Sequence, residues 1–165
     1  SPRARLVVGG DGYLYGSAER YEVERLNSRG QLVQLDRVCL GPLAVDRALW
    51  RRLLDQHIAR AENRYRTLIT EAFEAAPSRT TGPAYVDLLS DPDGWMWIGE
   101  FHLDAEPQVW RVIDRAGVLR ATVEVEPGVR VVEVGERHLL GIKTDQDDLQ
   151  TVVVYRWQRP EGQAK

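Results

Sequence analysis

The chain has 165 residues, enough for one domain or for an array of small repeated units. Its 43% hydrophobic and 28% charged residues are typical of a folded globular protein and exclude a disordered tail. Its net charge of -3 lacks the positive excess of nucleic-acid-binding domains, so we expect no nucleic-acid partner.

Residues 5–38 show the pattern of four short strands separated by turn residues. The apolar runs RLVVG and YLYG flank a GDG turn at 10–12. A second turn is expected at 28–30, because Gly30 can adopt a positive φ without steric cost. We expect this block to fold as a four-stranded antiparallel meander.

Residues 43–76 have the periodicity of an amphipathic helix, with Asp46 as the predicted N-cap and Pro77 as the predicted stop. About 30 residues at 1.5 Å each would extend roughly 45 Å, whereas a strand of about six residues spans about 20 Å. We therefore expect either a break into a helix pair or contact between part of the apolar stripe and something else. The stripe consists of Trp50, Leu54, Ile58, Ala61, Tyr65, Leu68, Ala72 and Ala76.

Two further strand blocks follow the helical segment. Residues 83–126 contain the turn signals DPDG at 91–94 and RAG at 115–117, with apolar strands on either side. Residues 129–157 contain two strands around Gly135 and a third that ends at Trp157. We expect a four-stranded sheet from the first block and an incomplete sheet from the second.

The first two strand blocks repeat one another. DGYLYG at 11–16 matches DGWMWI at 93–98, and YEVERLNSRGQLV at 21–33 matches WRVIDRAGVLRAT at 110–122. A period of about 40–45 residues with four strands per unit is typical of propeller blades. The predicted fold is therefore mainly β with one helical insertion, in a single unit over 1–165. It has about three propeller-like antiparallel four-stranded blades, the last one incomplete, which form an open arc.

Three motifs resemble the last blades of bacterial six-bladed β-propeller proteins: DGWMWI at 93–98, WRVIDRAG at 110–117 and the tail VVEVGERHLLGIKTDQDDLQTVVVYRW. In that family a D-x-x-G-x-x-W-V turn, a W-x-V-F-D-x-x-G hairpin and a closing V-x-V-Y strand recur, and a helical insertion between blades is tolerated. The resemblance covers nearly the whole chain. It implies the propeller fold and an exported protein, and it implies no particular activity or ligand.

A six-bladed ring at this period needs about 250 residues, so the chain has fewer than three complete blades. An incomplete ring leaves the outer faces of its terminal blades uncovered and leaves the last strand, 149–157, with unpaired backbone groups. Three resolutions stay open. The chain is a piece of a longer protein, or two chains pair to complete a six-blade ring, or the arc docks on another protein.

Residues that usually carry chemistry do not form a recognisable motif. His57, His102 and His138 lack metal-ligand spacing, and the acidic loop at 145–148 lacks the glycine and glutamate of a calcium loop. The sequence has no GxSxG, reactive-cysteine or phosphate-loop signature, and its single cysteine, Cys39, is expected to be a buried thiol. We expect no enzymatic activity, no cofactor and no metal.

The predicted partner-binding residues lie in the helical stripe, in the tryptophan-rich strand and in the last strand. Arginines on the polar face of the helix could bind an acidic partner or a membrane surface, or form ion pairs in solvent. A tryptophan of the strand either packs between blades or, if exposed, anchors a partner. The predicted residues are Trp50, Arg51, Leu54, Ile58, Tyr65, Trp95, Trp97, Val152, Val154 and Trp157.

Two functional hypotheses follow. The first is a non-catalytic scaffolding or accessory subunit, with no membrane span of its own. It would dock on other protein subunits of a larger membrane-associated extracytoplasmic assembly, such as a photosynthetic or respiratory complex. The second is the C-terminal part of a complete six-bladed propeller that binds or hydrolyses a small molecule. The predicted location is periplasmic or otherwise extracytoplasmic; no signal peptide is seen, and the opening Ser1-Pro2 predicts a processed or trimmed N-terminus.

Overall fold

The computed structural model describes residues 4–17, 22–37, 43–75, 81–83, 85–103, 105–145 and 147–159. The chain divides into two compact units, one made of Ser1–Leu40 with Ala84–Lys165 and the other of Gly41–Pro83. Cys39, predicted as a buried thiol, and Pro77, predicted to end the helix, lie outside the described residues.

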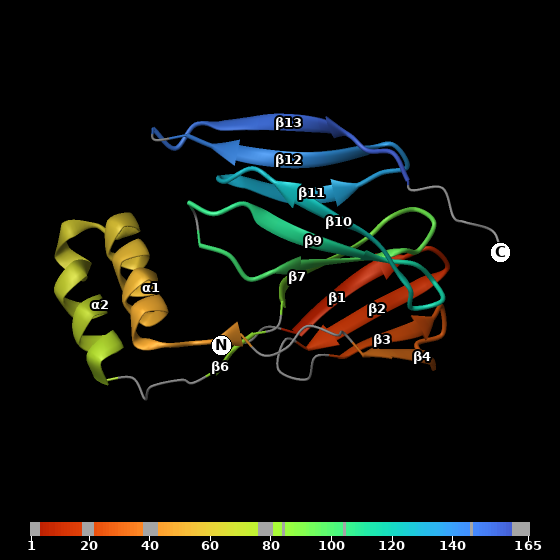
Figure 1. The fold of residues 1–165 in the computed structure, drawn as a ribbon, viewed down its shortest axis with the longest axis horizontal. Coiled ribbons are helices and arrows are strands. Elements are labelled where there is room, and N and C mark those ends of the chain that lie inside the picture. The colour runs from red at the N-terminus through yellow and green to blue at the C-terminus, as the bar shows by residue number, and fades with distance from the viewer. Residues whose placement is uncertain are drawn as a thin grey trace. The chain divides into compact units, whose positions relative to one another are not determined.

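The first unit contains three antiparallel sheets, and in each of them the strand order follows the chain (Figure 1). The structure thus confirms a mainly β fold, and it confirms that the last of these sheets has three strands. The first sheet consists of β1 (Ala4–Gly9), β2 (Gly12–Ser17), β3 (Glu22–Asn27) and β4 (Leu32–Arg37). The second consists of β7 (Tyr85–Ser90), β8 (Met96–Glu100), β9 (Gln108–Ile113) and β10 (Leu119–Val125). The third consists of β11 (Val129–Val134), β12 (His138–Thr144) and β13 (Gln150–Arg156).

Glycines form the predicted turns of the second sheet. Gly94 has a φ of 76°, and its N–H donates to the carbonyl of Asp91 at 2.9 Å. Gly117 has a φ of 80°, and its N–H donates to the carbonyl of Asp114 at 3.1 Å. Glycine adopts this region of φ without the steric cost that a Cβ brings, so both turns form where the sequence predicted them.

The repeat is less regular than the sequence match. The first hairpin closes with Gly9 opposite Gly12, whereas the second has a longer loop and closes with Ser90 opposite Met96. When two otherwise matching hairpins have loops whose lengths differ by an odd number of residues, the matched side chains of the following strands point to opposite faces, because side chains alternate between the two faces along a strand. The aligned residues Leu14 and Met96 consequently enter the same core from opposite sheets. The sequence match therefore pairs residues that point to opposite faces of their own sheets, and a shift of one position would align residues on equivalent faces.

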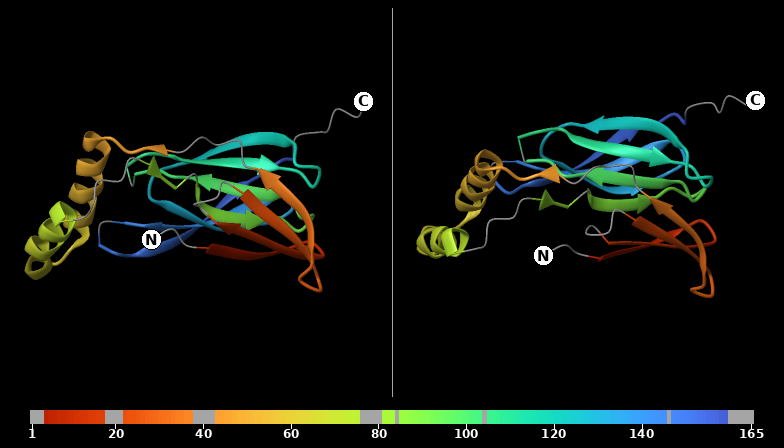
Figure 2. Two further views of the ribbon diagram at one scale, coloured as in Figure 1. Left: turned by 90° about the horizontal axis from the view of Figure 1, so that it is seen from below. Right: turned by 60° about the horizontal axis from the view of Figure 1, so that its bottom comes forward.

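The middle sheet packs on both of its faces, as Figure 2 shows for the layering of the strands. Met96 and Ile98 enter a core shared with the first sheet, whereas Trp97 enters a core shared with the third. This alternation follows from the two-residue period of a strand. The first core contains Leu14, Val23, Tyr85, Leu88, Met96 and Ile98. The second contains Trp97, Trp110, Val112, Val125, Val129, Val131, Val134, Leu139 and Trp157.

Close contacts join the first two sheets. A Cβ on Gly16 would lie 2.3 Å from the hydroxyl oxygen of Tyr85, so the backbone of β2 approaches this ring as only a glycine permits. Burial and, after it, the nearby Tyr15 raise the pKa of Tyr85 to about 12. The first strand of the middle sheet, β7, also contacts the first strands of its two neighbours, β1 and β11.

The second unit contains the predicted helical segment, which is a helix pair. Helix α1 spans Arg47–Arg60, helix α2 spans Asn63–Ala75, and strands β5 (Leu43–Ala44) and β6 (Thr81–Gly82) pair before and after them. Asp46 is the N-cap as predicted, since its carboxylate accepts from the N–H of Leu49 at 2.7 Å. No helix in the described part of the chain is long and apolar enough to cross a bilayer.

The break between the helices lies at Ala61, which has an extended backbone and donates its N–H to the carbonyl of Ile58 at 3.2 Å. The two helices meet through aromatic rings, with the centroids of Trp50 and Phe73 4.9 Å apart. Leu68, expected within the continuous stripe, is 62% exposed. Of the two alternatives for this segment, the helix pair is confirmed.

Candidate protein-binding surfaces

The first sheet has one uncovered face, named the N-terminal outer face. Its side chains alternate along the strands with Val7, Leu14 and Val23, which pack in the first core. Leu6 is 66% exposed and Val8 is 73% exposed. The apolar side chains of this face are Leu6, Val8, Tyr13, Tyr15, Leu26 and Leu35, which face one another across the strands.

The third sheet also has an uncovered face, named the C-terminal outer face. Its side chains alternate with those that pack in the second core, such as Leu139. Val152 is 67% exposed and lies opposite Ile142, and Val154 is 65% exposed and lies opposite Leu140. These neighbouring exposed apolar side chains make the face a candidate contact surface.

The two outer faces differ in charge. The N-terminal outer face carries Glu22 and Glu24 against one arginine, Arg37, which lies 3.5 Å from Glu22. The C-terminal outer face carries Arg130 and Arg156, which the register places beside the exposed valines. Within the part of the chain that the structure describes, neither of these two guanidinium groups forms an ion pair.

The last strand, β13, is the predicted open edge. It pairs with β12 alone among the described strands, because the order of the third sheet is β11, β12, β13. Alternate backbone N–H and C=O groups of an edge strand point away from the sheet and can pair with another chain. The edge and the C-terminal outer face are therefore adjacent parts of one surface.

The structure places the predicted partner-binding residues in different environments. Val152 and Val154 lie together on the C-terminal outer face. Trp97 is 0% exposed and Trp157 is 8% exposed, and their ring centroids are 4.8 Å apart in the second core. These two tryptophans hold the second and third sheets together and are therefore left out of the candidate surface.

Trp95 is covered by the chain itself. The guanidinium carbon of Arg159 lies 4.3 Å from the centroid of the Trp95 ring. Arg159 also forms an ion pair with the carboxylate of Asp91 at 2.6 Å and another with Asp93. Burial works to lower the pKa of Arg159, but Asp93 and Asp91 raise it above its ordinary value. Arg159 thereby joins the end of the described chain after β13 to the first turn of the second sheet.

The helical candidates divide between exposed and half-buried positions. Arg51 is exposed, and Tyr65 is 45% exposed, with the guanidinium carbon of Arg64 4.6 Å from the centroid of its ring. Trp50, Leu54 and Ile58 are half-buried. In this unit, Arg51 and Tyr65 are the predicted residues with most surface available to a partner.

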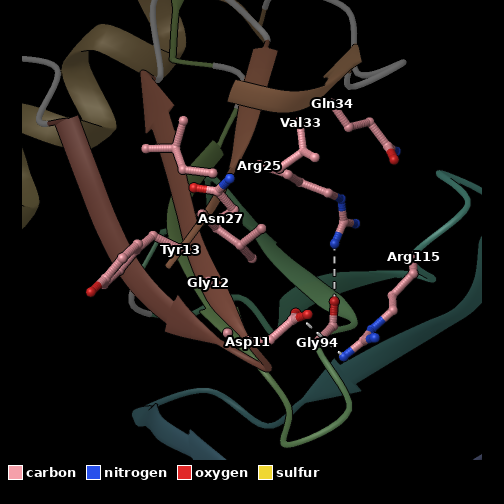
Figure 3. Close-up of a pocket in the computed structure, with 12 residues that line it drawn as sticks. Asp11, Gly12, Tyr13, Arg25, Asn27, Val33, Gln34, Gly94 and Arg115 are labelled. Atoms are coloured by element: carbon pink, nitrogen blue, oxygen red, sulfur yellow. Dashed lines mark hydrogen bonds and ion pairs between the residues drawn. The ribbon is translucent and has the colours of Figure 1, made fainter. Parts of the chain in front are cut away.

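A pocket of about 280 Å³ lies between the first and second sheets, beside their turns (Figure 3). Arg25 extends into it, and each of its three nitrogens has a partner: the carboxylate of Asp36 and the carbonyls of Gly94 and Asp114. Arg115 donates to the carbonyl of Asp93 at 2.6 Å. The residues that line the described pocket include the ionisable side chains Asp11, Tyr13, Arg25 and Arg115.

The histidines and the acidic loop have local partners. The ring of His57 contacts the carbonyl of Leu53 at 2.7 Å, and the ring of His138 lies 3.3 Å from a carboxylate oxygen of Glu133. Asp145 accepts from two backbone N–H groups of the turn between β12 and β13. Across the described residues, no three side chains of the types that hold metal ions are grouped together.

The sequence analysis predicted that the terminal faces would be uncovered but named no residue of the N-terminal outer face as partner-binding, although a signal for those residues is present. Leu6, Val7 and Val8 form a continuous apolar run, and Tyr13, Leu14 and Tyr15 form another. A strand with one solvated face alternates between apolar and polar residues, whereas a continuous run indicates that both faces are to be covered.

Comparison with protein-family models, with curated proteins and with solved structures found no match to this chain.

Proposed function

We propose that the three sheets are successive blades of a propeller-like arc. Three features support the proposal: strand order follows the chain in each sheet, neighbouring sheets pack face to face, and β7 contacts both β1 and β11. In a propeller the first strands of the blades lie next to one another around the axis. An arc of this kind has two terminal faces, which correspond to the two outer faces described above.

We further propose that the protein is a non-catalytic scaffolding or accessory subunit whose outer faces bind other protein. The observation that carries this proposal is the exposure of apolar side chains on both terminal sheets, with Val8 73% exposed and Val152 67% exposed. A soluble monomer rarely leaves contiguous apolar surface uncovered, since covering it contributes about 25 cal/mol per Å².

The larger assembly is proposed to be extracytoplasmic and membrane-associated, on the strength of the sequence resemblance to exported propellers. The same resemblance supports a second candidate, in which the arc is part of a larger propeller that binds or hydrolyses a small molecule. The pocket lined by Arg25 and Arg115 is the described feature that bears on this candidate. Arg115, which is more exposed than Arg25, would favour an anionic ligand over a neutral one.

A retention experiment tests the accessory-subunit proposal. The tagged wild-type protein and the variant Val152→Lys/Val154→Lys are purified from the native host in high salt, which weakens ionic contacts and leaves apolar ones. The wild type is expected to retain protein partners in stoichiometric amount, and the variant is expected to lose them while its circular dichroism is unchanged. A matched control is Thr151→Lys/Gln31→Lys, which adds the same two charges to exposed polar positions away from the C-terminal outer face: Thr151 lies on the side of β13 that carries Val153, and Gln31 lies in the turn between β3 and β4. Equal retention by the wild type and the valine variant contradicts the proposal.

A further inference from the structure

The two sheet-to-sheet contacts inside the first unit are of one kind. Val23 of β3 and Val112 of β9 occupy matching positions of the repeat, and each packs against the sheet that comes next in the chain. Met96 of β8 and Leu139 of β12 each pack against the sheet that comes before. Every sheet therefore has a forward face and a backward face, and each internal contact joins one forward face to one backward face.

The chain leaves one face of each kind unused. The N-terminal outer face is the backward face of the first sheet, and the C-terminal outer face is the forward face of the third sheet. Each has the composition of a face that packs, with Leu6, Val8 and Tyr15 on one and Leu140, Val152 and Val154 on the other. Both internal contacts join a forward face to a backward face, and these two unused faces are one of each kind. They are therefore of the kinds that pack together in this fold.

Charge complementarity supports the same pairing. Glu22 and Glu24 outnumber Arg37 on the N-terminal outer face. On the C-terminal outer face, Arg130 and Arg156 are exposed, and the single carboxylate, Glu133, lies beside His138. The first face presents an acidic excess and the second a basic excess. A contact of either face with itself would bring like charges together, whereas a contact between the two brings opposite charges together.

We propose that the partner of these faces is a second copy of the chain. The N-terminal outer face of each copy packs on the C-terminal outer face of the other, so that two copies close a ring of six sheets. This inference rests on the proposed propeller-like arrangement and names the partner of the faces assigned to protein binding. Such a contact is heterologous, and it closes when the rotation between copies completes a circle. Six sheets lie within the four to eight blades typical of closed propellers.

Sedimentation equilibrium of the purified full chain tests the ring, with charge reversals on one face at a time. The wild type is expected at twice the chain mass of 18.8 kDa. Glu24→Arg alone and Arg130→Glu/Arg156→Glu alone are each expected to raise the dimer dissociation constant about 100-fold, because a loss of about 10-fold at one contact occurs twice in the dimer. Arg29→Glu is the matched control, since Arg29 is exposed in the turn between β3 and β4, and it is expected to remain dimeric.

An equimolar mixture of the two reversed variants distinguishes this arrangement from others. In a heterologous ring the mixture restores opposite charges at one contact and keeps the wild-type charges at the other, so dimers reappear. A wild type that is monomeric, or that forms open-ended polymers, overturns the proposal, and so does a mixture that stays monomeric. A monomeric wild type that still retains another protein in the native host would leave the accessory-subunit proposal standing while the ring fails.

Discussion

Arg25 links the first two sheets through three hydrogen bonds, and replacing it by methionine tests how those sheets are joined. The Arg25 side chain is 12% exposed, and its Nε lies 2.5 Å from the carboxylate of Asp36, which is 8% exposed. Its other two nitrogens donate to the carbonyls of Gly94 and Asp114, both at 3.0 Å and both on turns of the second sheet. Arg25→Met keeps most of the apolar stem and removes all three bonds.

The expected loss follows from what the substitution leaves behind. Removing one partner of a buried ion pair costs about 3–5 kcal/mol, because the remaining charge is left in a poorly solvated place. Gln34 still donates to the Asp36 carboxylate at 2.6 Å, so the carboxylate keeps one neutral donor. We therefore expect Arg25→Met to lower the free energy of unfolding by about 3 kcal/mol, at the lower end of that range.

A double-mutant cycle separates the ion pair from the packing. Asp36→Asn alone is expected to destabilise, whereas the same change in the Arg25→Met background is expected to stabilise, since no cation remains for the carboxylate. Urea unfolding followed by tryptophan fluorescence reports on both, because Trp97 and Trp110 are buried. A loss below about 1 kcal/mol for Arg25→Met, or strictly additive effects, would refute the reasoning.

Two further predictions concern packing and pH. Gly16→Val is expected to lower the free energy of unfolding by about 1–3 kcal/mol, because its Cβ would collide with Tyr85. Gly30→Val has nothing within 4 Å of its Cβ but a φ of 75°. Its free energy of unfolding therefore measures the backbone cost of the substitution without a collision. Burial works to raise the pKa of Asp114, but the N–H of Val118 and the guanidinium of Arg120 lower it below its ordinary value. The ionised Asp114 carboxylate therefore contributes to the free energy of unfolding at pH values above the ordinary carboxyl pKa, and this contribution is lost as the pH falls through the lowered pKa of Asp114. Unfolding midpoints of the wild type and of Asp114→Asn should converge as the solution is acidified, and a constant difference across that range would contradict this assignment.

The sequence predicted the strands, the turns and the helix N-cap because local chemistry determines them. Gly94 and Gly117 turn where they do since glycine alone adopts their φ without strain, and Asp46 caps because its carboxylate reaches an unpaired N–H. The three strands of the last sheet were also predictable, since residues 129–157 contain three apolar runs separated by turn residues.

The remaining features depend on contacts between distant segments. The helix break at Ala61 has no glycine or proline beside it from which it could be predicted. The neighbours of Trp95 and Trp97 could not be read from their shared strand, because Arg159 covers the first and Trp157 packs on the second. The loop between β7 and β8 is longer than the loop between β1 and β2, and this difference decides that Leu14 and Met96 share a core. The similar DG turns of the two hairpins gave no sign of the difference.

Hydroxyl-radical footprinting of the purified protein tests most directly whether the two outer faces cover each other. In a single chain, Val8 and Val154 are 73% and 65% exposed and should be oxidised as fast as other exposed valines. We expect both valines to be protected in the wild type and both to become reactive in Glu24→Arg, although this substitution lies on one face. Oxidation of both valines at the rate of exposed residues in the wild type would contradict it.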